Sequence, residues 1–526
     1  MAPSPTDHTM ATGKSLTVTL RVGAFMIATG ALNSTVFAQA APEAPKLAVK
    51  DCIESALLHN LSLQADRVDP EIAQEQTEVA KGEFDPTMDL TVGTRVVQQS
   101  TSSSDLDGSD GPRNENFSAR AGVTKKIDTG ASVTVSTNMD RLLTNSEFST
   151  LNPAYDADVS LSVRQPLLDG FGTEVNRATR ERSLVGVDRA DYEMQANVLA
   201  IVQQTEAAFY NLAFQRARLK VRLAARDVAQ SFLDENTVRR ENGMATSLDV
   251  TQAEVGLADQ RALVLNSRQA VSDAEDLLLS LIGDFAFDQS VPELEIDLTI
   301  GEIPSVGGAY GVALEHQPDY QAALSLTEQL KFDVILARSR SRPRLDLGGA
   351  LGYSGRASSF SEAYEEIPEG DGYAWQVDVV LSVPWGQREG RARLRQTELV
   401  LQREELRIRD LEQALMMNIR TSVRAVETGL ERVDIAQLRR RLSNEEYELE
   451  KAKFEAGLST SRLVLDAQQR SDQARVSELQ AFVDLKNAWS ALQRVQGISL
   501  STYGIAMVPP GESESKSSEA GNSPAS

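Results

Sequence analysis

The spacing of hydrophobic positions divides this chain into long helical blocks separated by short extended ones. Residues 174–241 contain no proline and a single glycine, and residues 387–456 repeat that length without proline. At 1.5 Å per residue, each block would form a rod of about 100 Å. Helices of this length are typical of coiled coils and helical barrels, and they do not fit the core of a compact domain.

Each long block ends at a matched turn. Residues 243–249 read GMATSLD and residues 457–463 read GLSTSRL, with Gly, Thr and Ser in register. Glycine at each turn supplies a left-handed C-cap residue, and threonine or serine supplies the next N-cap. Helix is predicted to return from each turn as far as Ile282 and Val495.

The returning helix carries a heptad-like seam. Apolar and small residues recur at spacings of three and four, which indicates a left-handed coiled coil, although an ordinary amphipathic bundle gives the same pattern. The helical run 48–82 and the return helix 246–282 together match the long helix in length. A long helix flanked by two short helices placed end to end is therefore predicted. The seam positions are Val264, Ser267, Val271, Ala274, Leu278 and Leu281.

Alternating apolar and polar residues predict four strands between the helices, near residues 88–96, 159–163, 345–351 and 375–381. A membrane barrel and a soluble half-buried sheet both give this period of two. Residues 98–116 and 354–372 are polar and are predicted to be outer loops. Residues 117–136 resemble an added hairpin with a turn at Ile127–Gly130, for which the pattern gives no position.

The chain also repeats itself. Residues 56–90 align without gaps on residues 313–347 after a shift of 257 positions, and the same order of helices, strands and turns follows in both halves. A two-fold internal repeat of this kind indicates that the architecture itself carries the function. Ten of the 35 aligned pairs are identical: Ala56/Ala313, Leu57/Leu314, His59/His316, Gln64/Gln321, Ala65/Ala322, Glu71/Glu328, Ala80/Ala337, Pro86/Pro343, Asp89/Asp346 and Leu90/Leu347.

The ends of the chain differ from its body. Lys14 and Arg21 precede an apolar run of 11 residues, and small residues follow it, so residues 1–40 are predicted to be a signal peptide cleaved after Ala38 or Ala40. A membrane-anchor helix would need about 18 apolar residues. The first repeat is assigned to 41–285, a linker to 286–302, the second repeat to 303–500 and a disordered polar tail to 501–526.

Charge and chemistry narrow the function classes. The formal net charge is −23, which argues against a nucleic-acid partner. Cys52 is the only cysteine, and His59 and His316 have no companions at metal-ligand spacing. No nucleophile–base pair is evident either. We therefore expect no enzyme activity, no cofactor and no metal site.

At this point the residues resemble the TolC-like outer membrane efflux proteins, over roughly residues 47–500. The order, spacing and duplication of short matching pieces carry the resemblance. These pieces are ALLHN at 56–60 and ALEHQP at 313–318, the pre-strand prolines Pro86 and Pro343, QPLLDG at 165–170 and VPWG at 383–386 at the strand-to-helix junctions, and the two glycine turns.

The resemblance implies a homotrimer that is mainly α-helical and carries a membrane β-barrel. Each protomer would give four strands to a shared 12-stranded barrel in the outer membrane, and its long antiparallel helices would form a trimeric α-barrel tunnel in the periplasm. The implied partners are outer membrane lipid, a periplasmic adaptor and an inner-membrane pump. Four strands are too few to close a barrel, so oligomerisation is required if they span.

The resemblance also assigns roles at the two turns. The family has two aspartates that form a selectivity ring at the tunnel entrance; Asp466 matches the inner one, while Leu463 occupies the outer position. The alternative for Asp466 is a solvated charge on the helix surface. Asp249 matches a residue that holds the entrance closed. Its arginine partner is replaced by Ser459, with Arg462 one turn away as a substitute. Favourable interaction with the helix dipole explains Asp249 equally well. The adaptor would contact the turn residues Gly243, Thr246, Ser247, Gly457, Thr460 and Ser461.

Two functions of different classes follow. The first is a passive exit duct of a tripartite efflux or type I secretion system, which conducts small molecules or secreted protein to the exterior. The second is a structural periplasmic coiled-coil protein without channel activity. The sequence names neither the cargo nor the class of pump.

Overall fold

The computed structural model describes residues 46–98, 111, 113–147, 149–283, 291–297, 299–369 and 372–505. These residues belong to one compact unit. The predicted signal peptide 1–40, most of the predicted loop 98–116 and residues 506–526 of the predicted tail lie outside the described residues, as does the side chain of Ser461.

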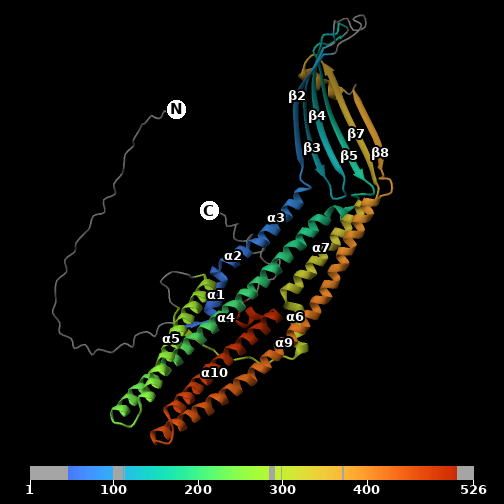
Figure 1. The fold of residues 1–526 in the computed structure, drawn as a ribbon. Helices are drawn as coiled ribbons and strands as arrows, with labels where there is room; N and C mark the ends of the chain where they lie inside the picture. Colours follow the sequence, from blue (N-terminus) through green and yellow to red (C-terminus); the bar gives the residue numbers. More distant parts are fainter. Residues whose placement is uncertain are drawn as a thin grey trace, which may run out of the picture. The chain divides into compact units, whose positions relative to one another are not determined.

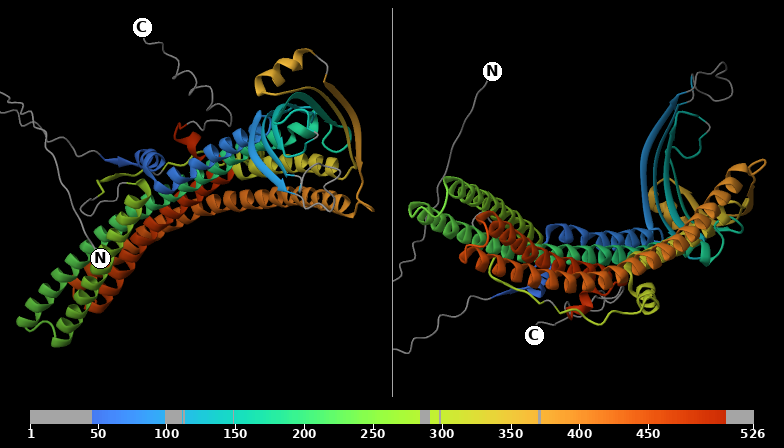
Figure 2. Two further views of the ribbon diagram at one scale, coloured as in Figure 1. Left: turned by 90° about the horizontal axis from the view of Figure 1, so that it is seen from above. Right: turned by 60° about the horizontal axis from the view of Figure 1, so that its bottom comes forward.

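Four long helices form two antiparallel hairpins (Figure 1). The first hairpin consists of α4 (Thr173–Glu241) and α5 (Ser247–Ile282), and the second consists of α9 (Arg388–Glu455) and α10 (Ser461–Gln496). Their bounds lie within two residues of the predicted ones. Both views of Figure 2 show the two hairpins side by side, with α10 in contact with α4.

Shorter helices extend each hairpin towards the sheet. The predicted run 48–82 is divided into α1 (Val49–His59), α2 (Leu61–Asp66) and α3 (Val68–Gly82). α1 is separated from α2 by Asn60, which takes an extended conformation and accepts the Leu63 amide at 3.1 Å through its side chain. In the second half, α6 (Val306–His316) and α7 (Pro318–Arg340) take the same places in the chain. The bounds of α6 equal those of α1 shifted by 257 positions.

The short helices meet end to end beside α4, as the residue counts predict. The joint is a close backbone contact: Gly283 ends α5 with φ 75°, and a Cβ added there would lie 2.4 Å from the His59 carbonyl oxygen. The Asn60 side-chain amide closes the joint by donating to the Leu281 carbonyl at 2.9 Å. Gly497 (φ 76°) meets the His316 carbonyl in the same way in the second half.

Within the described residues one antiparallel sheet holds six strands, so the prediction of four strands per protomer is wrong. The order along the sheet is β2-β3-β4-β5-β7-β8, and a separate two-stranded parallel pair joins β1 (Leu47–Ala48) to β6 (Leu294–Glu295). The six strands are β2 (Thr87–Gln98), β3 (Arg113–Lys126), β4 (Ser132–Thr144), β5 (Ala154–Pro166), β7 (Arg344–Ala357) and β8 (Tyr373–Ser382).

The two additional strands are the predicted added hairpin, which the sequence pattern left without a position. β3 and β4 turn at Ile127–Ala131 and lie between β2 and β5 (Figure 1). They have 14 and 13 residues, which matches their neighbours, and every strand is hydrogen-bonded to the next along its length. The hairpin is therefore part of the sheet itself.

Regular structure occurs in the described parts of the predicted loop 354–372 and of the predicted tail. Residues 354–372 contain the end of β7, then α8 (Phe360–Glu366) and η2 (Ile367–Glu369). The polar composition reflects a capped helix: the Ser359 side chain accepts the Glu362 amide. At the other end, α11 (Ser499–Thr502) crosses the predicted boundary at 501, and Tyr503 and Ile505 pack against the core.

The helical core lies along the seams of the two hairpins. One cluster joins α1, α4 and α5 around Phe209, Leu212 and Leu278, and a second joins α6, α9 and α10 around Ile419 and Leu492. From the predicted seam of the return helix, Ala274 and Leu278 belong to the first cluster, and Val264 and Ser267 are buried as well. Among the described residues, none of the helices combines the length and the apolar composition that crossing a membrane requires.

Candidate functional site at the helix tips

Both hairpins end in the same backbone motif, at the end remote from the sheet (Figure 1). At the first tip the Gly243 amide donates to the Arg240 carbonyl at 2.9 Å and the Met244 amide donates to the Arg239 carbonyl at 2.8 Å. This is a Schellman turn, which requires a left-handed residue, and Gly243 supplies it with φ 75°. The second tip repeats the motif around Gly457 (φ 76°).

The first turns of the return helices differ between the two tips. Thr246 and Asp249 form a reciprocal capping box: the Asp249 amide donates to Thr246 Oγ1 at 3.3 Å, and the Thr246 amide donates to Asp249 Oδ2 at 2.8 Å. Hydrogen bonds from Thr246 lower the pKa of the Asp249 carboxyl. At the second tip Thr460 makes no side-chain cap bond, and the Leu463 amide donates to the Thr460 carbonyl at 3.0 Å. Leu463 stands where Asp249 stands in the first tip and has no carboxylate to accept the Thr460 amide.

The second tip is held from the other side of its turn. The Ser459 hydroxyl donates to Glu450 on α9, and Lys453 pairs with the same carboxylate at 3.1 Å. These two contacts lower the pKa of Glu450. Ser459, which replaces the expected arginine partner of Asp249, therefore binds a residue of its own hairpin.

A small apolar cluster joins the two hairpins just behind their tips. Phe232 of α4 and Phe454 of α9 have ring centroids 5.5 Å apart, and buried Ala253 and Val464 of the return helices complete the cluster. The Arg239 guanidinium lies 4.4 Å from the centre of the Phe454 ring. This cation–π contact adds a polar link between the hairpins.

Three of the four predicted entrance residues are exposed and Asp249 is half-buried, and the four are not brought together within one protomer. Asp466 is exposed, and its side chain makes no hydrogen bond or ion pair with any residue that the structure describes. Leu463 is 48 % exposed and lies three residues before it on the same helix. Arg462 is exposed and does not pair with Asp249 within the described part of the chain, since Asp249 is engaged in its own cap.

The structure adds three exposed apolar residues that the sequence analysis did not single out. Met244, Leu248 and Leu458 are 67 %, 63 % and 80 % exposed at the two tips. Met244 and Leu458 each follow the turn glycine, so the signal for both lay in the matched turn sequences. The turn residues Gly243, Thr246, Ser247, Gly457 and Thr460 are exposed beside them.

A buried polar cluster links the two halves further along the helices. Glu206 of α4 is 1 % exposed, and the Ser490 hydroxyl of α10 donates to its carboxylate. Burial raises the pKa of Glu206. Lys486 of α10 donates to the Thr299 carbonyl of the inter-repeat segment at 2.5 Å, and burial lowers the pKa of this lysine.

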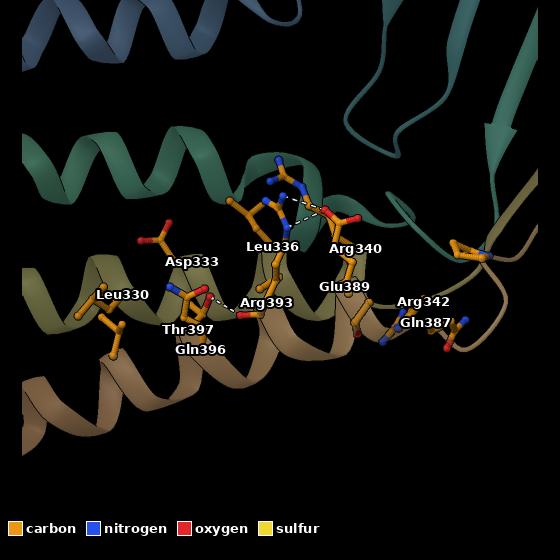
Figure 3. Close-up of a pocket in the computed structure, with 15 residues that line it drawn as sticks. Leu330, Asp333, Leu336, Arg340, Arg342, Gln387, Glu389, Arg393, Gln396 and Thr397 are labelled. Carbon is orange, nitrogen blue, oxygen red and sulfur yellow. Dashed lines mark hydrogen bonds and ion pairs between the residues drawn. The ribbon is translucent and has the colours of Figure 1, made fainter.

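One cavity lies between α7 and α9 where the helices approach the sheet (Figure 3). It has a volume of about 640 Å³ and is lined by charged residues of both signs, among them Arg340 and Arg393. Arg393 is already paired with Glu389 at 2.8 Å. In the described part of the chain no group of three or more His, Cys, Asp or Glu side chains could hold a metal ion.

A protein family and two curated relatives match this chain. The family described as "Outer membrane efflux protein" matches residues 131–284 and 309–497, one segment in each half. The curated relatives are 26 % identical: the outer membrane protein OprJ of Pseudomonas aeruginosa over 60 % of this chain, and the pyoverdine export outer membrane protein OpmQ of the same organism over 76 %. The match spans 64 % of OprJ and 82 % of OpmQ.

Solved structures share the fold. The Campylobacter jejuni outer membrane channel CmeC superposes with a TM-score of 0.65 at 16 % identity, covering 90 % of this chain and 88 % of that one. The Neisseria gonorrhoeae channel MtrE, in its open state, gives a TM-score of 0.60 at 17 % identity, with 86 % and 89 % covered. The family match in both halves and the shared fold give one conclusion: this chain belongs to the outer membrane efflux protein family, which is a family of outer membrane proteins and not of enzymes.

Proposed function

We propose that the protein is the outer-membrane exit duct of a tripartite efflux or type I secretion system. Three copies would form the duct, in which the sheets close into a barrel in the outer membrane and the helical hairpins form a tunnel in the periplasm. The two halves of each chain act as structural repeats, which supply equivalent hairpins to the tunnel. Cargo would pass down the duct without chemical change.

The observation that carries the proposal is the two-faced sheet joined directly to the long helices. One face of the sheet is apolar and exposed, and the other carries polar groups such as Arg164, Asp346 and Asp378. α4 and α9 begin within seven residues of β5 and β8. A strand face that is apolar and exposed fits lipid, and a polar opposite face fits a water-filled lumen.

The helix tips would form the entrance of the duct. Under three-fold symmetry, the exposed Asp466 side chains of three copies would converge, and Leu463 would add an apolar constriction nearer the tip. The turn residues Gly243, Thr246, Ser247, Gly457, Thr460 and Ser461 would receive a periplasmic adaptor, which connects the duct to an inner-membrane pump.

Membrane fractionation tests the duct directly. We expect the protein in the outer membrane as a trimer that migrates differently on a denaturing gel before and after heating, and we expect it to conduct ions in a planar bilayer. A monomer in the soluble periplasmic fraction would instead identify a structural coiled-coil protein.

A pair of substitutions in one strand tests which face meets lipid. Val379 is 63 % exposed on the apolar face of β8, and Asp378 lies on the opposite face. Val379→Arg should destabilise the assembled protein by about 2–4 kcal/mol, because a charge near the bilayer midplane is poorly solvated. Asp378→Arg is the matched control and should cost much less. Equal losses of assembled trimer in outer membranes would contradict the facing assignment.

A further inference from the structure

The six-stranded sheet has two unpaired edges. β2 at one edge and β8 at the other are 12 and 10 residues long, and nearly every residue in both is exposed. Long exposed edge strands pair readily with other chains, and proteins normally shorten, cover or charge them. Here the edges stay long and retain exposed apolar side chains such as Val92 and Val377. They are therefore suited to pairing with a strand of another copy.

The direction of the strands determines which edge strands of two copies can pair. All neighbouring strands are antiparallel, so with six strands β2 and β8 run in opposite directions. β8 of one copy can therefore pair with β2 of the next in the same antiparallel manner as every pair inside the sheet. An odd number of strands would force a parallel seam between copies. The β3–β4 hairpin adds two strands, so it preserves this closure.

The hairpin has the same two faces as the rest of the sheet. The paired register aligns one apolar residue from each of the six strands in a single row, and all six are between 43 % and 73 % exposed. This row crosses β3 and β4 without interruption. Its members are Met88, Val123, Val135, Leu161, Leu351 and Trp375.

The adjacent row on the opposite face is polar across β2, β3, β4 and β5. Thr124 and Thr134 share a hydrogen bond of 2.9 Å across β3 and β4, and they stand in register with Thr87 and Ser162. One row further, Ser136 and Ser160 share another of 2.9 Å across β4 and β5. A hairpin folded over the sheet as a cover would not continue its apolar and polar rows. β3 and β4 therefore form part of the wall.

We propose that three copies close an 18-stranded barrel through β8–β2 seams, and not a 12-stranded one, so that the mouth of the duct is a wide aqueous pore. This rests on the proposed trimeric duct. Barrel diameter grows roughly in proportion to strand number, and walls of 16–18 strands leave an open channel, so the bore is about 1.5-fold wider than a 12-stranded wall gives. The narrowest part of the duct would then lie at the helix tips alone.

Engineered disulfides test the strand order in outer membranes. Leu90 and Ala121 are directly paired partners in β2 and β3, so Leu90→Cys with Ala121→Cys should form a disulfide within each copy. Leu90→Cys with Val159→Cys should not, because two strands separate these residues. Cys52 is fully buried, and burial raises the pKa of its thiol to about 12, so it stays unreactive.

The seam between copies has its own variants. Leu90→Cys combined with Val377→Cys or with Val379→Cys should give covalent trimers on a reducing-agent-free gel from at least one pair. Ala121→Cys with Val377→Cys is the matched control and should give none, because Ala121 lies one strand inside the edge.

Removing the β3–β4 hairpin tests the width of the barrel. Deletion of residues 113–150 takes out two antiparallel strands, and β2 and β5 that remain still run in opposite directions. Cryo-electron microscopy of the trimer in lipid nanodiscs should count 18 strands in the wild type and 12 in the deletion, with the barrel diameter reduced to about two-thirds.

The outcomes separate the two proposals. A 12-stranded wild-type trimer in the outer membrane, with a Leu90–Val159 disulfide, would overturn the wide barrel and leave the exit duct standing. A soluble monomer would overturn both. Should the deletion variant fail to assemble, the disulfide pattern of the full chain decides the strand order by itself.

Discussion

At the residue scale, the two helix tips share a backbone turn and differ in one side chain of the cap. Asp249 completes a capping box with Thr246, whereas Leu463 at the matching place leaves Thr460 without one. The capping box explains Asp249 without a neighbouring chain, since the favourable position of an acid in the first helical turn adds to the hydrogen bonds. Asp466 has no such local partner among the described residues, so its charge is free to act on what passes the tip.

Asp466 gives a prediction about ion conduction. Three carboxylates that converge on a symmetry axis attract multivalent cations. Asp466→Asn should therefore weaken block of channel current by cations added from the periplasmic side by on the order of tenfold, which corresponds to about 1.4 kcal/mol of binding free energy. Leu463→Asp should strengthen the block. Planar-bilayer recordings with equal block in the wild type and both variants would contradict a ring at Asp466.

Glu206 gives a prediction about pH. Burial raises its pKa above the ordinary value of 4.5, so the folded protein holds this proton over a pH range in which the unfolded chain has released it. Stability from this group is therefore greatest below pH 4.5 and falls as pH rises through the folded-state pKa. Wild-type stability should decline relative to Glu206→Gln between pH 4 and pH 7, measured as the temperature at which trimers dissociate on a gel. A constant difference across that range would contradict the assignment.

At the element scale, positive-φ glycines mark the helix ends but serve two different purposes. Gly243 and Gly457 close exposed turns, where an added Cβ would meet open space. Gly283 and Gly497 close joints, where the backbone of His59 or His316 approaches closely. The first pair requires glycine for its conformation only, and the second requires it for conformation and for space.

This difference is measurable by paired substitutions. Gly243→Ala should cost about 1–2 kcal/mol, because only the left-handed conformation is penalised. Gly283→Ala should cost about 2–5 kcal/mol, since the new methyl group must also displace the His59 carbonyl. Thermal unfolding followed by circular dichroism compares the two variants. Equal shifts of the unfolding midpoint would show that the His59 carbonyl moves aside at no cost in stability.

At the scale of the whole molecule, the length of the duct follows from its longest helices. α4 has 69 residues and α9 has 68, each in a single uninterrupted helix. Short helices joined end to end cover each of them, so no partner helix of equal length is needed.

The assembled particle should therefore show a stalk of about 100 Å beyond the membrane-embedded barrel, at 1.5 Å per residue. Negative-stain images of detergent-solubilised trimers measure this length directly. Compact particles without a stalk would rule out the tunnel.

The sequence by itself determined the helical architecture, because its signals are local. Absence of proline over nearly seventy residues, a glycine C-cap and a threonine N-cap act within a turn or two of chain. They placed α4, α5, α9 and α10 within two residues. The strand positions were found for the same reason, since alternation is a property of neighbouring residues. The polar composition of 354–372 predicts a loop where the structure has a short helix, because a short capped helix of polar residues has no apolar stripe.

Only the tertiary structure decided the width of the sheet and the contacts of the tips. Alternation shows that residues 117–136 favour strands but not which strands they join, since pairing depends on hydrogen bonds between segments distant in the chain. The joint between Gly283 and His59 and the cluster around Phe454 likewise bring together residues from separate helices. No local pattern contains that information, and packing of the long helices against one another supplies it.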